Sequence, residues 1–180
     1  SKDKLCIWTV DSFTDQPFSG NPAAVTIVAD FPPDDLCQKI ASEINLSETA
    51  FLKPIGQNHF HIRWFTPTVE VKLCGHATLA SAHILFENGW VKGDYLTFES
   101  LSGPLYVKQS GSHIILNFPL QKVGTSFSSP LLIRIFGTTQ ILTAVQAYDD
   151  VIVELLEEED VRSLVLDPSQ ILEIDCRGLI

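Results

Sequence analysis

The sequence is poor in basic residues. It contains 12 lysines and arginines against 22 aspartates and glutamates, which gives a net charge of −10 at pH 7 and an isoelectric point near 4.8. Nucleic acids and anionic membrane surfaces attract proteins mainly through Lys and Arg. We therefore expect neither a nucleic acid nor a membrane as a partner.

Long apolar runs are also absent. No stretch reaches the roughly 20 residues that a membrane-spanning helix needs, and no targeting segment opens the sequence. The four cysteines, Cys6, Cys37, Cys74 and Cys176, are widely separated and form no Cys-x-x-Cys pair. This spacing is typical of reduced thiols rather than of a disulfide scaffold, so we expect a cytoplasmic protein.

The common cofactor fingerprints are missing as well. No Gly-x-Gly-x-x-Gly follows a predicted strand, no Gly-x-x-x-x-Gly-Lys loop occurs, and no serine lies in a nucleophile elbow. His59 and His61 share one face of a predicted strand, but no third ligand follows at a spacing that suits a metal. We therefore expect neither a cofactor nor a metal ion.

Apolar residues make up 45% of the sequence, which is ample for a packed core. Strands outnumber helices and do not alternate regularly with them, which argues against a doubly wound parallel sheet. We predict an α+β domain over residues 1–118, in which mixed strands curl around one helix. Its predicted helices are 32–45 and 77–88, and its predicted strands are 5–10, 23–29, 49–53, 60–65, 70–73, 95–99, 105–108 and 114–118.

Residues 119–180 form a separate part of the chain. The polar stretch 119–130 is interpreted as a linker. About sixty residues are few for a well-buried domain, so we expect the first part of a truncated second domain. Its predicted elements are a helix at 131–136, strands at 142–148 and 151–156, an acidic helix at 158–164 and a last apolar segment.

The predicted helix 77–88 is apolar or small on nearly all sides, which is typical of a buried helix. Cys74-Gly75-His76 precede it and would place a thiol and an imidazole among unpaired backbone N–H groups. Such a helix start attracts anions and lowers the pKa of a nearby thiol. A small molecule with a carboxylate is the expected guest. The alternative is a buried cysteine beside a turn glycine and a capping histidine.

Further polar residues lie near predicted turns. Glu48, between a helix end and an apolar strand, is either a partly desolvated general base or an ordinary strand-edge residue in water. Asn21, between Gly20 and Pro22, either orients a substrate or only serves the turn. Arg63 either points outward or clamps a carboxylate. Together, a carboxylate, a thiol, an imidazole and a helix N-terminus suit proton transfer at a carbon next to a carboxylate.

Four segments, in this order and spacing, resemble the phenazine-biosynthesis PhzF-like family. They are DSFT (11–14) with FSGNPAAV (18–25), NLSETAF (45–51), IRWFTP (62–67) and EVKLCGHATLA (70–80). The resemblance implies the diaminopimelate-epimerase-like fold, in which two similar domains each roll a mixed sheet around a central helix and share an active site. It also implies isomerisation of a small carboxylate without a cofactor.

The resemblance assigns roles by position. Glu48 matches the family's catalytic glutamate, and His76 matches its active-site histidine. Gly75 and Ala77 would offer backbone N–H groups to the substrate carboxylate, and Asn21 matches an asparagine that lines the site. The implied partners are a small carboxylate-bearing substrate and, in a homodimer, a second copy of the chain.

Two features depart from the family pattern. Cys74 occupies a place where related epimerases and racemases use a thiol as a proton-transfer base, whereas the phenazine enzyme has none. We therefore count Cys74 as a third catalytic candidate. The family's Asp-Pro-x-Thr-Gly-Ser segment is missing, because the only Asp-Pro, Asp167-Pro168, continues as Ser169-Gln170. A catalytically silent or partner-binding member of the same fold is the alternative.

Overall fold

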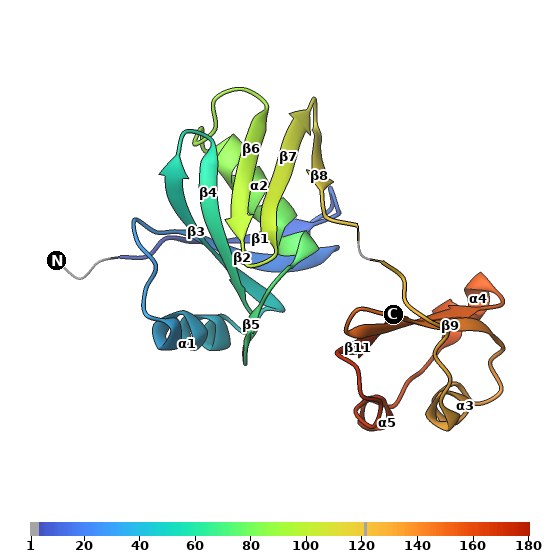
Figure 1. Cartoon of the computed structure of the whole chain (residues 1–180). Helices are drawn as coiled ribbons and strands as arrows, with labels where there is room; N and C mark the ends of the chain where they lie inside the picture. The colour runs from blue at the N-terminus through green and yellow to red at the C-terminus, as the bar shows by residue number, and fades with distance from the viewer. Residues whose placement is uncertain (1–3, 121) are drawn as a thin grey trace. The chain divides into compact units, whose positions relative to one another are not determined.

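The computed structural model describes residues 4–120 and 122–180 (Figure 1). Contacts between Cα atoms divide the chain into two compact units, with the boundary between Pro119 and Leu120. Each unit has a sheet and an apolar core of its own. Among the described residues, no helix combines the length and the apolar character that crossing a membrane requires.

The first unit is built on one mixed sheet. Its order is β1-β2-β3-β4-β6-β7-β8, and β5 pairs with β4. The pairs β2/β3 and β4/β6 are parallel, and the other neighbours are antiparallel. The sheet curls around one helix, as predicted (Figure 1). Its strands are β1 (Ile7–Ser12), β2 (Asn21–Ile27), β3 (Glu48–Gly56), β4 (His59–Phe65), β5 (Glu70–Val71), β6 (Tyr95–Ser100), β7 (Gly103–Ser110) and β8 (His113–Asn117).

Helix α2 (Gly75–Glu87) lies inside the curl and packs against β1, β2, β3 and β8 (Figure 1). Two buried hydroxyl groups of this helix donate hydrogen bonds to backbone carbonyl oxygens at its start. Thr78 donates to the carbonyl oxygen of Cys74 over 2.5 Å, and Ser81 donates to that of Ala77 over 2.7 Å. The predicted core helix is confirmed. Its buried residues are Ala77, Thr78, Ala80, Ser81, Ala82, Ile84 and Leu85.

Helix α1 (Asp34–Ile44) covers the other face of the sheet. Its buried residues, Cys37 and Ala41, pack with the aromatic rings of Phe51 on β3 and Phe65 on β4. Strand β3 is therefore buried on both faces, because its alternate residues pack into the core around α2.

The prediction that Ile40 and Ile44 point inward from α1 is confirmed for Ile40, which packs against the cluster of Cys37, Ala41, Phe51 and Phe65. Both side chains are only partly buried. Cys37 and Ala41 share their helix face and occupy its centre, so the two isoleucines lie toward the edge of the contact.

Arg63 is a clamp for carboxylates of the protein itself. Its Nε and Nη2 atoms each donate to one carboxylate oxygen of Glu70 over 2.7 Å, and its Nη1 donates to Asp34 over 2.9 Å. Paired hydrogen bonds of this kind fix geometry as well as charge. Of the two roles considered for Arg63, the structure supports the clamp, which joins β4, β5 and the start of α1.

The two histidines of β4 make different local contacts. The Nε2 atom of His59 lies 2.8 Å from Oε1 of Glu99 on the neighbouring strand β6. His61 packs edge-on against Phe31 with 5.1 Å between the ring centroids, and burial lowers its pKa. The shared strand face predicted for these residues thus serves a histidine–carboxylate contact and an aromatic contact.

The second unit has a smaller core around a sheet of order β11-β10-β9. Strands β9 and β10 are antiparallel, and β10 and β11 are parallel. The elements are α3 (Pro130–Phe136), β9 (Ile141–Ala147), β10 (Asp150–Leu155), α4 (Glu158–Ser163), α5 (Pro168–Ile171) and β11 (Gly178–Leu179). The buried apolar residues are Leu132, Ile135, Phe136, Ala144, Val151 and Ile174.

Truncating a side chain of α2 should test the central role of this helix. Leu85 is fully buried, so Leu85→Ala should lower the free energy of unfolding of the first unit by about 2–5 kcal/mol. Guanidinium unfolding followed by tryptophan fluorescence is a suitable measurement, because all three tryptophans, Trp8, Trp64 and Trp90, belong to the first unit.

The matched control for this prediction is His83→Ala, because His83 is an exposed residue of the same helix. We expect it to change the free energy of unfolding by no more than about 0.5 kcal/mol. Equal effects of the two substitutions would contradict a buried central helix.

Candidate active site

The N-terminus of α2 carries two of the predicted site residues. Cys74 is the N-cap residue, with extended backbone (φ −146°, ψ 115°), and His76 is the second residue of the helix. The hydroxyl of the buried Ser12, at the end of β1, donates to the carbonyl oxygen of His76 over 2.8 Å. Strand β1 therefore holds the first turn of the helix in place.

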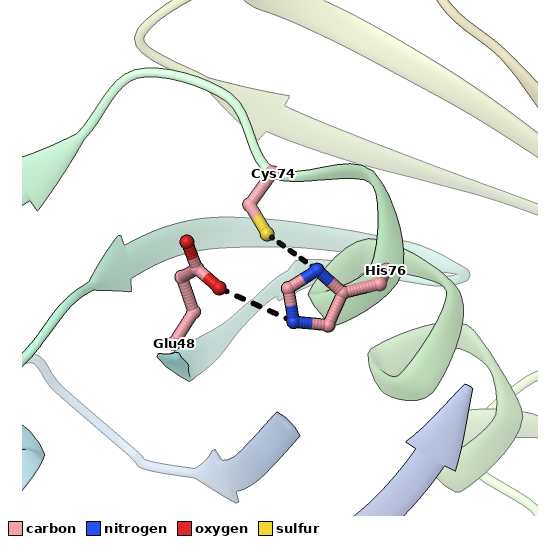
Figure 2. Close-up of side chains that lie close together, drawn as sticks. All are labelled: Glu48, Cys74 and His76. Atoms are coloured by element: carbon pink, nitrogen blue, oxygen red, sulfur yellow. Dashed lines mark hydrogen bonds and ion pairs between the residues drawn. The ribbon is translucent and has the colours of Figure 1, made fainter. Parts of the chain in front are cut away.

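Glu48 reaches the same place from the start of β3. Helix α1 ends at Asn45, which takes the left-handed conformation (φ 54°, ψ 34°) common at helix C-termini. Glu48 then pairs with Ala23 in the parallel ladder between β2 and β3. This position brings the Oε2 atom of Glu48 to within 3.2 Å of the Nε2 atom of His76 (Figure 2).

The imidazole of His76 lies between three polar side chains. Its Nδ1 atom is 3.4 Å from the sulfur of Cys74, and its Nε2 atom is 3.1 Å from the hydroxyl oxygen of Ser47 as well as close to Glu48. In a neutral imidazole one nitrogen donates and the other accepts. The ring therefore connects a thiol on one side to a carboxylate on the other (Figure 2).

The three side chains of Glu48, Cys74 and His76, which we call the trio, are largely shielded from water. The side chains of His76 and Glu48 expose 11% and 18% of their area, and Cys74 is buried. Within the described part of the chain, the buried Oε2 of Glu48 finds no hydrogen-bond partner, although it lies at ion-pair distance from the imidazole. This oxygen therefore keeps capacity to accept a hydrogen bond from another group.

Burial raises the pKa of the Cys74 thiol to about 12, and the nearby Glu48 carboxylate acts in the same direction. The backbone N–H groups of Ala77 and His76 lower this pKa, as expected at a helix N-terminus, but their effect is smaller than that of burial. The prediction that the helix start depresses the pKa of the thiol is therefore wrong in its outcome. Cys74 carries its proton at neutral pH.

The other predicted site residues flank the trio. Gly75 and Ala77 belong to the first turn of α2, where backbone N–H groups lack intrahelical acceptors. A Cβ atom on Gly75 would meet the ring of Phe118 at 3.6 Å, an ordinary van der Waals distance, so packing alone does not require glycine. The exposed Asn21 begins β2 and pairs with Ser12, the residue that holds the start of α2.

Two serines contribute to this arrangement although the sequence did not single them out. Ser47 bonds the imidazole of His76, and Ser12 bonds its backbone carbonyl. Adjacent residues of a regular strand point to opposite faces. Ser47 lies in the bend before β3, where this alternation does not apply, so Ser47 and Glu48 can both contact one ring.

A cavity of about 590 Å³ in the first unit lies beside the trio rather than around it. It is lined by the end of β1 with the residues that follow, by one side of α2 and by the turn between β7 and β8. The cavity lining includes Ser12 but none of the trio. We place the candidate site at the trio, because the converging acid, base and thiol are there.

Comparison with known proteins agrees with this architecture. The family described as phenazine biosynthesis-like protein matches residues 10–180. An uncharacterized isomerase of Pseudomonas aeruginosa is 43% identical over 171 residues, which are 95% of this chain and 65% of the relative. The chain therefore spans slightly less than two thirds of that relative's length.

Solved structures confirm the expected fold. A PhzF-family phenazine biosynthesis protein of Enterococcus faecalis superposes with a TM-score of 0.85 at 38% identity, covering 96% of this chain and 65% of that one. A predicted epimerase of Pseudomonas aeruginosa shares the fold with a TM-score of 0.72 at 19% identity, covering 95% of this chain and 66% of that one. The architecture is thus the diaminopimelate-epimerase-like α+β fold. With a matching family and a relative of this identity, the chain belongs to the phenazine biosynthesis-like (PhzF) protein family.

Proposed function

We propose that the trio is an isomerase-type site that moves a proton on a small carboxylate substrate without a cofactor, with Glu48 as the general acid and base. The observation that carries the proposal is the 3.2 Å approach of the Glu48 carboxylate to the His76 imidazole at the N-terminus of a buried helix. The isomerase name of the Pseudomonas relative supports the same reaction class.

The first step is the binding of the substrate carboxylate at the start of α2. Backbone N–H groups of Gly75 and Ala77 would donate to it, and the partial positive charge of the helix N-terminus would favour it. Ala77 also directs its N–H toward the sulfur of Cys74, so the thiol and the substrate would lie side by side. The amide of Asn21, at the neighbouring strand end, would orient the far part of the substrate.

The chemical step is a proton transfer at the carbon next to the carboxylate. Glu48 takes the proton, the C–H bond breaks, and its electron pair spreads into the substrate carboxylate. The helix N–H groups stabilise the charge that develops there. Glu48 then returns the proton to another carbon on the same face of the substrate, which completes an isomerisation.

His76 and Cys74 would assist from the same side of the site. The imidazole holds the Glu48 carboxylate near the start of α2 and is itself held by Ser47. Because the thiol of Cys74 keeps its proton at neutral pH, we assign it the role of proton donor rather than of base. A cytoplasmic location and a homodimer stay predictions.

Replacing the proposed base should remove proton exchange. With the chain in D₂O and a panel of small carboxylates that carry an acidic C–H, deuterium should enter the substrate, as followed by NMR or mass spectrometry. Glu48→Gln should slow this exchange by roughly a hundredfold to ten-thousandfold, because the amide cannot take the proton.

The chain offers a matched control in its second histidine–carboxylate pair. Glu99→Gln makes the same chemical change beside His59, away from the trio, and should leave the exchange rate unchanged. Equal exchange in Glu48→Gln and the parent chain would show that Glu48 is not the base. If a carboxylate bound to the parent chain exchanged no proton, that result would favour the silent or partner-binding alternative.

The raised pKa of Cys74 predicts how this thiol reacts. Because the thiolate is the nucleophile, alkylation of Cys74 by iodoacetamide should rise about tenfold per pH unit from neutral pH to about pH 10, with no plateau. Peptide mapping by mass spectrometry would report the rate at each cysteine, and the exposed Cys6 should react faster than Cys74.

Glu48→Gln tests whether the slow alkylation of Cys74 comes from its raised pKa or from poor access of the reagent to the buried thiol. Removing the negative charge beside the thiol should lower the pKa of Cys74 and speed its alkylation, whereas Glu99→Gln should not. A Cys74 rate that levels off near neutral pH would mean that the helix N-terminus outweighs burial.

A further inference from the structure

We propose that the trio also binds one thiophilic divalent cation of the zinc class, and that the bound cation blocks proton transfer. The blocking effect rests on the proposed function, whereas the binding rests on the geometry of the three side chains alone. The ion would act as an inhibitor of the site and not as a resident cofactor.

The donor set carries the proposal. Glu48 offers a carboxylate oxygen, Cys74 a sulfur and His76 a ring nitrogen, and these atoms all lie within 4.8 Å of one another. Zinc is commonly held by such donors at about 2.0–2.3 Å, which places neighbouring ligand atoms of a tetrahedron roughly 3.5 Å apart. Three protein ligands would leave the fourth position open.

One edge of that tetrahedron is already formed. The sulfur of Cys74 and the Nδ1 atom of His76 are 3.4 Å apart. The Glu48 side chain starts from the first residue of β3, and one of its carboxylate oxygens lies within 4.8 Å of the sulfur and of a ring nitrogen of His76 (Figure 2). The backbone under the other two ligands is held by the hydrogen bonds of Ser12 and Thr78.

The surroundings of the imidazole suit a metal ligand. A metal-bound histidine usually donates its second ring N–H to an oxygen nearby. If Nδ1 binds the cation, Nε2–H can donate to the hydroxyl of Ser47, which lies 3.1 Å away. The same structure leaves the buried Oε2 of Glu48 without a hydrogen-bond partner in the described residues, and a cation would satisfy it.

The charges also balance. Binding releases the thiol proton of Cys74 to solvent, so a thiolate and the Glu48 carboxylate together offset the double positive charge. A neutral cluster avoids the cost of an uncompensated charge in a site that is largely shielded from water. With all three side chains coordinated, no free base remains for the substrate.

The experiment is a titration of the chain with Co²⁺, which reports on its ligands through its absorption spectrum. We expect one equivalent to bind, with a thiolate-to-cobalt charge-transfer band in the near ultraviolet, and Zn²⁺ to displace it. Cys74→Ser should abolish the band, and Glu48→Gln should weaken binding by roughly tenfold or more while keeping the band.

Two matched variants test specificity. Cys6→Ser removes the exposed thiol and His59→Ala removes the other histidine–carboxylate pair, and both should leave the band and the affinity unchanged. Tryptophan fluorescence would confirm that each variant is folded. A band that persists in Cys74→Ser, a band lost in Cys6→Ser, or an affinity unchanged in Glu48→Gln would overturn the site.

The inhibitory part has its own readout. Saturating Zn²⁺ should stop deuterium exchange, and a chelator should restore it. Exchange that continues with the ion bound at the trio would overturn the blocking effect but not the binding. Failure of exchange in the metal-free chain would count against the proposed function, and the cobalt titration would still decide the metal site.

Discussion

Helix α2 has almost no polar face, and a helix of this kind is stable only where other elements cover it on all sides. The strands of the first unit supply that cover by curling around it (Figure 1). Parallel pairing of β2 with β3 matters most for the site, because it aligns the start of β3 with the first turn of the helix. The position of Glu48 beside His76 thus depends on how the strands are arranged around α2.

The same burial sets the chemistry of the helix start. A helix N-terminus attracts negative charge, and water opposes the transfer of a charge into an apolar site. At Cys74 burial outweighs the helix, so the thiol stays protonated. Under the proposed function, a substrate carboxylate would face a different balance, because it would accept hydrogen bonds directly from the N–H groups of the first turn. Burial thus keeps the thiol of Cys74 protonated, while the first turn keeps N–H groups that lack intrahelical acceptors.

Sequence patterns predicted the parts of this structure that depend on local preference. The small and apolar residues of α2 and the strand-forming runs were enough to predict the fold. The motif around Glu48 and the residues before α2 were enough to predict two parts of the candidate site. What they missed depends on contacts across the chain. Ser47 meets His76 only because a bend precedes β3. For Arg63 the sequence left two roles open, and only its contacts with Glu70 and Asp34 decide for the clamp. The pKa of Cys74 likewise depends on burial, which no local pattern reports.

Two histidine–carboxylate pairs in the first unit show what distinguishes a candidate site from a surface contact. His59 and Glu99 lie 2.8 Å apart, closer than His76 and Glu48 at 3.2 Å. Yet the side chains of the first pair expose 39% and 42% of their area, so water screens their interaction and satisfies their remaining atoms.

The pair beside α2 exposes far less area and leaves one carboxylate oxygen without a hydrogen-bond partner in the described chain. It also adjoins a thiol and the unpaired N–H groups of the first turn. A short distance alone is therefore a poor guide to function. Shielding from water, together with unused hydrogen-bonding capacity around one imidazole, is what distinguishes this pair as the candidate site.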